Sequence, residues 1–527
     1  MTFMTLRHAR GSLVAVLLVL VAAAAADLQL RATRGELAAG RSEVAAGISK
    51  LSAGSAKLPA GSSELPAGSR KLEAGSPKLE AVIQPARPNI LLIHADDLGY
   101  GDLSAYGQKH FQTPALDRMA REGIRFTAYY SGSTVCAPSR AALMTGYHTG
   151  HGWIRGNGRL PEGDVPLRAE DVTLGEVLRD AGYRTAVIGK WGLGQPGTTG
   201  MPDRQGFDYA FGFLDHRHAH RQFTDHLYRN GERVPTNVTS DYAGDLFTSE
   251  ASAFIERDDA RPFFLYLNYT VPHAEMWAPD DAIAPFRGKF PETPFENPKA
   301  DGRQTGARPD AASLGYRSQP TPRAAFAAMV TRMDRDVGRL LEVIRARGLD
   351  DRTLVMFTSD NGPHREGGAD PAFFGSSGPL RGIKRDLYEG GIRVPAIARW
   401  PGTVPAGRVS DHPWAHWDVL PTFAEVGAAS APRGIDGMSM SRALRGEPQA
   451  THPFFYWEFH ERGFQQAVRM GRWKAVRLKA GVPLELYDLE ADQSETRDVA
   501  ATQPDVVRKI EAYLTGARTE SARWPVE

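Results

Sequence analysis

The chain has 527 residues and a mass of 57.5 kDa, and its composition, 42% hydrophobic and 24% charged, is that of an ordinary globular protein. This length allows roughly two to four domains. The 63 basic and 62 acidic side chains leave a formal net charge of +1. Such a balance gives no charged field that would favour nucleic acid or a membrane surface as a partner.

The first 26 residues have the pattern of an export signal. Arg7, His8 and Arg10 precede an apolar run over residues 13–21, and alanines follow up to Ala26. The run is short for a membrane span, and its small-residue end fits a cleavage site. We therefore expect a signal peptide cleaved near Ala26, no stable membrane span, and a mature protein that is periplasmic or secreted.

Residues 27–86 are low in complexity, and residues 36–80 repeat a seven-residue unit, as in ELAAGRS and KLPAGSS. Heptads suggest a coiled coil, but only one strongly apolar position recurs. Each complete unit also carries a glycine, and three prolines interrupt the repeat, which disfavours helix. We predict a flexible spacer. An adhesive or wall-spanning role stays open on composition alone.

Residues 87–450 alternate between short apolar runs and helical patterns, and we expect them to form the catalytic domain. The runs NILLIHADD, TAVIGKW, RPFFLYLNYTVPH and TLVMFTSDNG are nearly continuous in apolar residues, and helices are expected at 174–181 and 324–347. This arrangement indicates an α/β fold, with a large, mostly parallel sheet sandwiched between helices. The Pro-, Gly- and Arg-rich segment 279–322 is predicted to be a long surface insertion.

Residues 451–527 follow a different pattern. The segments FFYWEF, QAVRMG and WKAVRL are closely spaced and strand-like, and a helical pattern follows near residues 504–515. We expect a smaller C-terminal α+β subdomain that is built on an antiparallel sheet and closed by this helix.

Four of the predicted strands end in side chains that can carry chemistry. Ligands bind beyond the carboxyl ends of the strands in doubly wound sheets, so we expect these side chains to converge. They are Asp96, Asp97, Lys190, His273, Asp360 and Asn361. Taken alone, ADDLGYGD would be a loop with helix-capping aspartates and SDNG a simple turn. Together their carboxylate and amide oxygens predict a site for a hard cation, calcium or magnesium.

Cys136 is the only cysteine in the chain, so it has no intrachain disulfide partner although export favours disulfides. A free cysteine is usually a small buried hydrophobe. Pro138 suits a first helical turn, which places Cys136 at a helix amino terminus, where N–H groups attract anions. Arg140 adds a positive charge one turn later.

Five segments in family order are similar to one protein family. In chain order they are NILLIHADDLGYGDL, CAPSRAALMTG, AVIGKWGLG, SDNG and GIKRDLYEGGIRVPAIARWPG. From about Arg87 to the carboxyl terminus, the chain resembles the type I sulfatases of the alkaline phosphatase superfamily. The resemblance implies an alkaline phosphatase-like fold and a sulfuric ester hydrolase.

The resemblance also implies a role for each site residue. A formylglycine-generating enzyme would convert Cys136 to Cα-formylglycine, whose hydrated aldehyde is the nucleophile. Arg140 would hold the diol and the metal site, Lys190 and Lys384 would neutralise the sulfate oxygens, and His273 would protonate the leaving oxygen. One calcium ion would be bound by Asp96, Asp97, residue 136, Asp360 and Asn361.

The sequence departs from the family at Gly192, where many sulfatases carry a histidine that helps to deprotonate the diol during sulfate release. His148, His151 or His364 could replace it, and we assign the role to none of them. A second histidine group lies nearby in sequence, at positions 216, 218, 220 and 226. It lacks regular metal-ligand spacing, so we expect a polar loop, with substrate as a candidate neighbour.

The substrate is not fixed by the sequence. A sulfated carbohydrate or an aryl sulfate would fit, and export favours the carbohydrate. Two alternatives stay open: a phosphonate or phosphate monoester hydrolase of the same superfamily, and a non-catalytic carbohydrate-binding surface protein.

Overall fold

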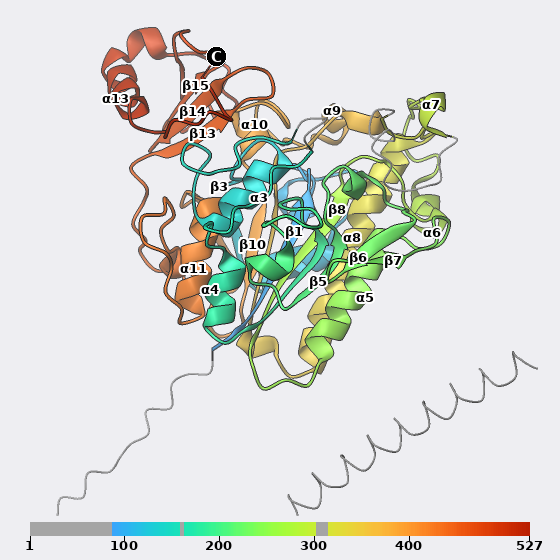
Figure 1. Cartoon of the computed structure of the whole chain (residues 1–527). Coiled ribbons are helices and arrows are strands. Elements are labelled where there is room, and N and C mark those ends of the chain that lie inside the picture. The colour runs from blue at the N-terminus through green and yellow to red at the C-terminus, as the bar shows by residue number, and fades with distance from the viewer. Residues whose placement is uncertain (1–86, 159–162, 302–314, 527) are drawn as a thin grey trace, which may run out of the picture. The chain divides into compact units, whose positions relative to one another are not determined.

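The apolar runs of the sequence form the centre of a ten-stranded sheet in the computed structural model (Figure 1). The structure describes residues 87–158, 163–301 and 315–526. The predicted signal peptide and spacer lie outside the described residues. In sheet order the strands are β11 (Arg408–Ser410), β2 (Ile124–Phe126), β10 (Ala396–Arg399), β9 (Thr353–Ser359), β1 (Asn89–Asp96), β8 (Phe263–Pro272), β4 (Arg184–Lys190), β5 (Tyr209–Phe213), β6 (His226–Arg229) and β7 (Glu232–Pro235).

The five central strands, β9, β1, β8, β4 and β5, are all parallel. Ile90 of β1 pairs with Phe264 of β8 on one side and with Leu354 of β9 on the other. Antiparallel pairs occur only towards the edges of this sheet, at β2–β10, β10–β9, β5–β6 and β6–β7. The α/β fold with a mostly parallel sheet is therefore confirmed.

Helices cover both faces of the sheet, as the continuous apolar runs require. Alternate β1 residues point to opposite faces. Leu91 and Ile93 belong to a core with α2 (Pro114–Arg121), α5 (Ala243–Glu256) and α8 (Pro322–Ala346). Ile90 and Leu92 belong to a second core. Its helices are α3 (Cys136–Thr145), α4 (Leu174–Asp180) and α11 (Val419–Val426), seen on the other side of the sheet in Figure 1.

The C-terminal residues form the predicted separate antiparallel sheet. Its strands and helix are β13 (Phe455–Phe459), β14 (Gln465–Met470), β15 (Trp473–Arg477), β16 (Glu485–Asp488) and α13 (Pro504–Leu514). One face packs on α13, and Trp457 on the other face packs on Trp417 of the larger part. Both faces are buried, so this sheet is an integral part of the fold. The boundary at residue 450 stays a prediction.

Short elements complete the described chain. The helices are α6 (Asp280–Ile283), α7 (Pro298–Asp301), α9 (Pro371–Phe374), α10 (Glu389–Ile392) and α12 (Ser441–Leu444), and β3 (Tyr129–Tyr130) pairs with β12 (Trp414–Ala415). Within the segment 279–322, a bridge between Phe295 and Gln319 joins the two arms on either side of residues 302–314, which are not described. Among the described helices, none is both long and apolar enough to cross a membrane.

Candidate active site

The predicted site residues do meet at one edge of the sheet. Asp96 ends β1, Lys190 ends β4, His273 follows β8, and Asp360 follows β9. Because these strands are parallel, their carboxyl ends share an edge. Ligand atoms of Asp96, Asp97, Cys136 and His273 all lie within 4.8 Å of one another, and these side chains are buried.

Three buried carboxylates at this edge each have a buried basic partner. Lys190 Nζ lies 2.6 Å from Asp96 Oδ2, and Lys384 Nζ lies 2.8 Å from Asp97 Oδ2. Arg140 donates from Nη2 to Asp360 Oδ2 at 2.8 Å. Arg140 also donates to the carbonyl of Lys190 and to Asn268, which fixes its side chain. The three basic side chains thus surround residue 136 with positive charge.

Cys136 is the first residue of α3, as predicted, and its Sγ lies 3.4 Å from Asp96 Oδ1. Burial, together with Asp96 and Asp360, raises the pKa of the Cys136 thiol well above its usual value, although Lys190 and Lys384 act in the opposite direction. A thiol in this state is a poor nucleophile, because the thiolate is the reactive form. The native side chain is therefore badly suited to direct attack on an ester.

The oxygen atoms at the strand ends fit a divalent cation. Asn361 Oδ1 is buried and has no hydrogen-bond partner among the described residues, whereas its Nδ2 donates to Asp97 Oδ1 at 2.6 Å. A buried, unpaired amide oxygen is costly unless a cation binds it. Burial and the charge of Asp96 raise the pKa of Asp360, which again indicates a need for positive charge. The donors are oxygens, as hard cations prefer.

His273 lies against this cluster. Its Nε2 is 3.0 Å from Lys384 Nζ and 3.3 Å from Asp97 Oδ2. Nδ1 contacts the carbonyl of Ala274, so Nδ1 carries the proton and Nε2 accepts from the Lys384 ammonium. Burial, then Lys384 and Lys190, lower the pKa of His273 well below its usual value. The ring is neutral and lies within hydrogen-bond reach of a proton donor.

Three further residues reach His273, of which the sequence had offered only His364 as a site candidate and had not placed His220 or Glu366 there. The rings of His220 and His364 stack on His273 with centroids 4.2 Å and 5.4 Å away, both at 19°. Glu366 Oε2 lies 3.9 Å from His273 Nε2. The cluster 216–226 had been expected to be polar, but no spacing in the sequence indicated that His220 packs on His273.

The structure shows which histidines could replace the one that Gly192 lacks. His148 and His151 lie past the carboxyl end of α3, a ten-residue helix about 15 Å long that begins at Cys136. Both ring nitrogens of His364 are engaged, by the carbonyl of Pro272 and the N–H of Glu366. None of these three histidines is therefore available near residue 136.

His216 lies beside Gly192 instead. A Cβ built on Gly192 would be 3.6 Å from the Cβ of His216, and apart from its chain neighbours no other atom of the described residues would be within 4 Å. His216 Nδ1 contacts the carboxylate of Asp164, and Asp164 Oδ2 also accepts from the His216 N–H at 3.0 Å. This is a carboxylate–imidazole pair at the position where the family histidine is missing.

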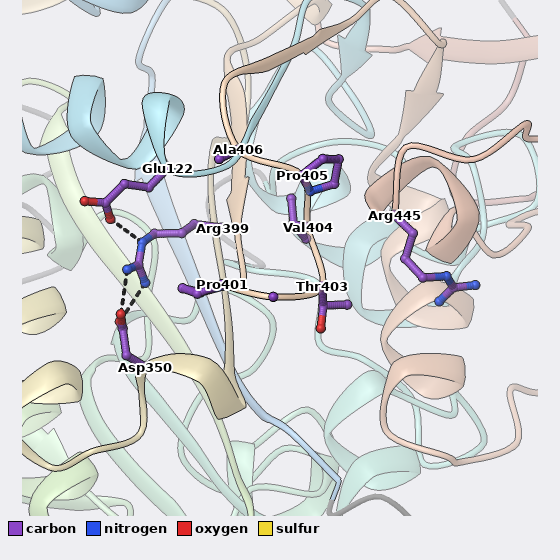
Figure 2. Close-up of a pocket in the computed structure, with 10 residues that line it drawn as sticks. Glu122, Asp350, Arg399, Pro401, Thr403, Val404, Pro405, Ala406 and Arg445 are labelled. Atoms are coloured by element: carbon purple, nitrogen blue, oxygen red, sulfur yellow. Dashed lines mark hydrogen bonds and ion pairs between the residues drawn. The ribbon is translucent and has the colours of Figure 1, made fainter.

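A surface pocket of about 650 Å³ lies elsewhere, at the opposite end of the sheet (Figure 2). Arg399, which ends β10, pairs with Val355 near the start of β9, whereas Asp360 follows the end of β9. The guanidinium of Arg399 is already bound by Asp350 and Glu122. Arg445, which also lines the pocket, donates to Glu447 at 3.1 Å. Both arginines of this pocket are therefore paired, and the strand-end cluster is the candidate active site.

Comparison with known proteins agrees with this geometry. Residues 88–428 match the sulfatase family model, and residues 383–520 match a model described as N-sulphoglucosamine sulphohydrolase, C-terminal. The chain belongs to the sulfatase family. An N-acetylgalactosamine-6-sulfatase from Canis lupus familiaris is 34% identical over 420 residues, covering 74% of this chain and 72% of that protein. An arylsulfatase from Hemicentrotus pulcherrimus is 31% identical over 414 residues, covering 74% and 67%.

Solved structures share the fold of this sulfatase. The crystal structure of Ps i-CgsB in complex with k-i-k-neocarrahexaose has a TM-score of 0.69 at 28% identity and covers 84% of this chain and 95% of that chain. Phosphonate monoester hydrolase of Agrobacterium radiobacter has a TM-score of 0.60 at 22% identity, covering 82% and 95%, which shows the fold alone. With the family matched, the protein is a sulfuric ester hydrolase.

Proposed function

We propose that this sulfatase hydrolyses its ester through Cα-formylglycine at position 136, beside one calcium ion. The observation that carries the proposal is the buried contact of Cys136 Sγ with Asp96, within a group in which ligand atoms of Asp97 and His273 also lie within 4.8 Å. A formylglycine-generating enzyme would be needed during maturation, and formylglycine would supply a hydroxyl nucleophile that the buried thiol does not.

Asp96, Asp97, Asp360 and Asn361 would hold the calcium ion together with residue 136. When bound, calcium acts as a Lewis acid and lowers the pKa of a hydroxyl next to it. Three carboxylates and three basic side chains cancel in charge at this edge of the sheet. A divalent cation would add two positive charges, which matches the two negative charges of released sulfate.

The basic side chains would bind the sulfate group. Lys190 and Lys384 each hold a buried carboxylate and would turn towards the sulfate oxygens when calcium takes over these carboxylates. Arg140 is held by Asp360 and Asn268 and would keep the nucleophile oriented. His273 is neutral here, so its Nε2 would take a proton from the Lys384 ammonium and pass that proton to the leaving oxygen, which leaves Lys384 as the neutral amine.

His216 would act in sulfate release. Its contact with Asp164 through Nδ1 would orient the ring so that Nε2 could accept a proton, as a carboxylate does for a catalytic imidazole. Its place beside Gly192 supports this role.

The substrate is proposed to be a sulfated carbohydrate, and the protein to be exported to the periplasm or secreted. Two similar proteins support a carbohydrate substrate: the N-acetylgalactosamine-6-sulfatase, and Ps i-CgsB, whose structure is in complex with k-i-k-neocarrahexaose. The export-signal pattern predicted over residues 1–26 supports the proposed export.

The proposed chemistry is tested by kinetics of protein matured with a formylglycine-generating enzyme. We expect hydrolysis of 4-nitrophenyl sulfate, loss of at least about a thousandfold in kcat/KM in Cys136→Ala, and a lower rate on a matched aryl phosphonate. A phosphonate rate above the sulfate rate would favour the phosphonate hydrolase alternative.

A further inference from the structure

Consecutive basic residues of the GIKRDLYEGG loop point in different directions. Lys384 reaches Asp97 and His273. Arg385 has a positive φ of 75°, which is unusual for a residue with a side chain and indicates a turn held by its surroundings. Its side chain goes instead to Glu366 and Glu461. The turn thus separates a buried lysine in the site from an arginine at its edge.

Arg385 links two carboxylates and, through one of them, a tyrosine. Its Nη1 donates to Glu366 Oε1 at 2.7 Å, and its Nε donates to Glu461 Oε2 at 2.9 Å. The Tyr316 hydroxyl donates to Glu366 Oε2 at 2.8 Å. We call Tyr316, Glu366, Arg385 and Glu461 the Arg385 array. Its three charged side chains are 21–27% exposed, so solvent or a ligand can reach them.

The Arg385 array adjoins the atom that would protonate the leaving group. Glu366 Oε2 is 3.9 Å from His273 Nε2, and the Tyr316 ring lies 6.2 Å from the His273 ring and 5.7 Å from that of His220. If the ester oxygen lies at His273, Glu366 faces the atoms of the alcohol next to that oxygen. In that pose the array would contact the alcohol and not the sulfate.

We propose that the Arg385 array is the leaving-group subsite and selects a sugar ring with a free hydroxyl on the carbon next to the sulfated one. This inference rests on the proposed function. Glu366 is an acceptor that such a hydroxyl can reach while the ester oxygen contacts His273. An aryl group without a hydroxyl cannot add this hydrogen bond to Glu366, whose oxygens would keep only their contacts with Arg385 and Tyr316, so it loses affinity relative to the sugar.

The charge of the Arg385 array limits which groups the substrate can carry beside the sulfate ester. Two carboxylates and one guanidinium give the array a net negative charge, so a second sulfate or a carboxylate on the neighbouring carbon is repelled. Tyr316 offers an apolar ring face for the sugar C–H groups. Glu461 lies between β13 and β14, so the C-terminal sheet contributes to the subsite.

The test compares two kinds of substrate on the enzyme produced with a formylglycine-generating enzyme. The first kind is a set of methyl galactosides, each with a single sulfate on a ring carbon and free hydroxyls on the neighbouring carbons. The second is 4-nitrophenyl sulfate. For Glu366→Gln we expect the ratio of kcat/KM on the best galactoside to that on 4-nitrophenyl sulfate to fall at least tenfold. Glu461→Gln is expected to raise KM for the galactoside more than it lowers kcat.

The matched control is Arg462→Gln, because Arg462 is next in sequence to Glu461 but its exposed side chain pairs only loosely with Asp386, at 3.6 Å. This control should keep both rates within about twofold. An unchanged ratio in both array variants overturns the inference, as does wild-type enzyme that hydrolyses 4-nitrophenyl sulfate but no galactoside. Matured wild-type enzyme that hydrolyses neither substrate overturns the proposed function itself, which is a distinguishable result.

Discussion

His273 is held in one protonation pattern by its neighbours, with Ala274 at Nδ1 and Lys384 at Nε2. A proton donor at the leaving oxygen matters most when the alcohol is a poor leaving group. We expect His273→Ala to lower kcat about a hundredfold or more on a sugar sulfate and much less on 4-nitrophenyl sulfate. Steady-state kinetics on both substrates measures this. An equal loss on both would show that His273 does not protonate the leaving oxygen.

His216 and Asp164 form a pair whose role differs from that of His273. If His216 acts only after the S–O bond to the alcohol is broken, His216→Ala should slow sulfate release and leave the first step intact. We expect a burst of nitrophenol followed by a steady rate about tenfold or more below that of the wild type. Asp164→Asn should reduce the steady rate in the same direction. A variant with no burst and normal turnover would remove His216 from the reaction.

At the scale of elements, an ion network joins α10 to the C-terminal sheet. Lys474 of β15 lies 3.0 Å from Glu389 and 3.5 Å from Glu495, and all three side chains are fully buried. Tyr130 also donates to Glu389. The network fixes the small sheet against α10, and the loop that leads into α10 carries Lys384 and Arg385.

Removing the Lys474 ammonium should lower the stability of the fold, because the buried carboxylates of Glu389 and Glu495 would then face each other without a positive charge between them. We expect Lys474→Met to lower the free energy of unfolding by about 3 kcal/mol or more. Arg472→Gln is the control on the neighbouring turn, since its pair with Asp488 is 40% exposed on the arginine side and is worth about 1 kcal/mol at most. Urea unfolding of both variants measures the difference. Equal stabilities would mean that the network does not anchor the sheet.

At the scale of the whole molecule, folding and metal binding should be separable. Each carboxylate of the proposed calcium site already has a basic partner, so chelation should leave the protein folded and remove activity. We expect EDTA to abolish hydrolysis, calcium to restore it, and the melting temperature to rise with calcium concentration. Asn361→Ala should weaken this rise, because it deletes an oxygen ligand. Full activity after exhaustive chelation would contradict the calcium site.

The sequence allows the sheet and most of the site to be predicted, because the relevant signals are local. Asp96 and Lys190 end apolar strands, and parallel strands bring their ends together whatever the loops do. The position of Cys136 at a helix start follows from Pro138 two residues later.

Other parts of the site depend on long-range packing and could not be predicted. His220 reaches His273 through a short 3-10 turn (His218–His220) whose placement depends on the loop after β8. Glu366 and Glu461 are 95 positions apart, and the turn at Arg385 that joins them has no sequence signal, since positive φ usually indicates glycine.

The most direct test of the central claim is the mass of one tryptic peptide. Cleavage after Arg125 and Arg140 releases residues 126–140, which contain Cys136. In protein produced with a formylglycine-generating enzyme, we predict a peptide mass in which an aldehyde replaces the thiol, and the active fraction should follow the converted fraction. A fully active enzyme whose peptide keeps its thiol would contradict the account.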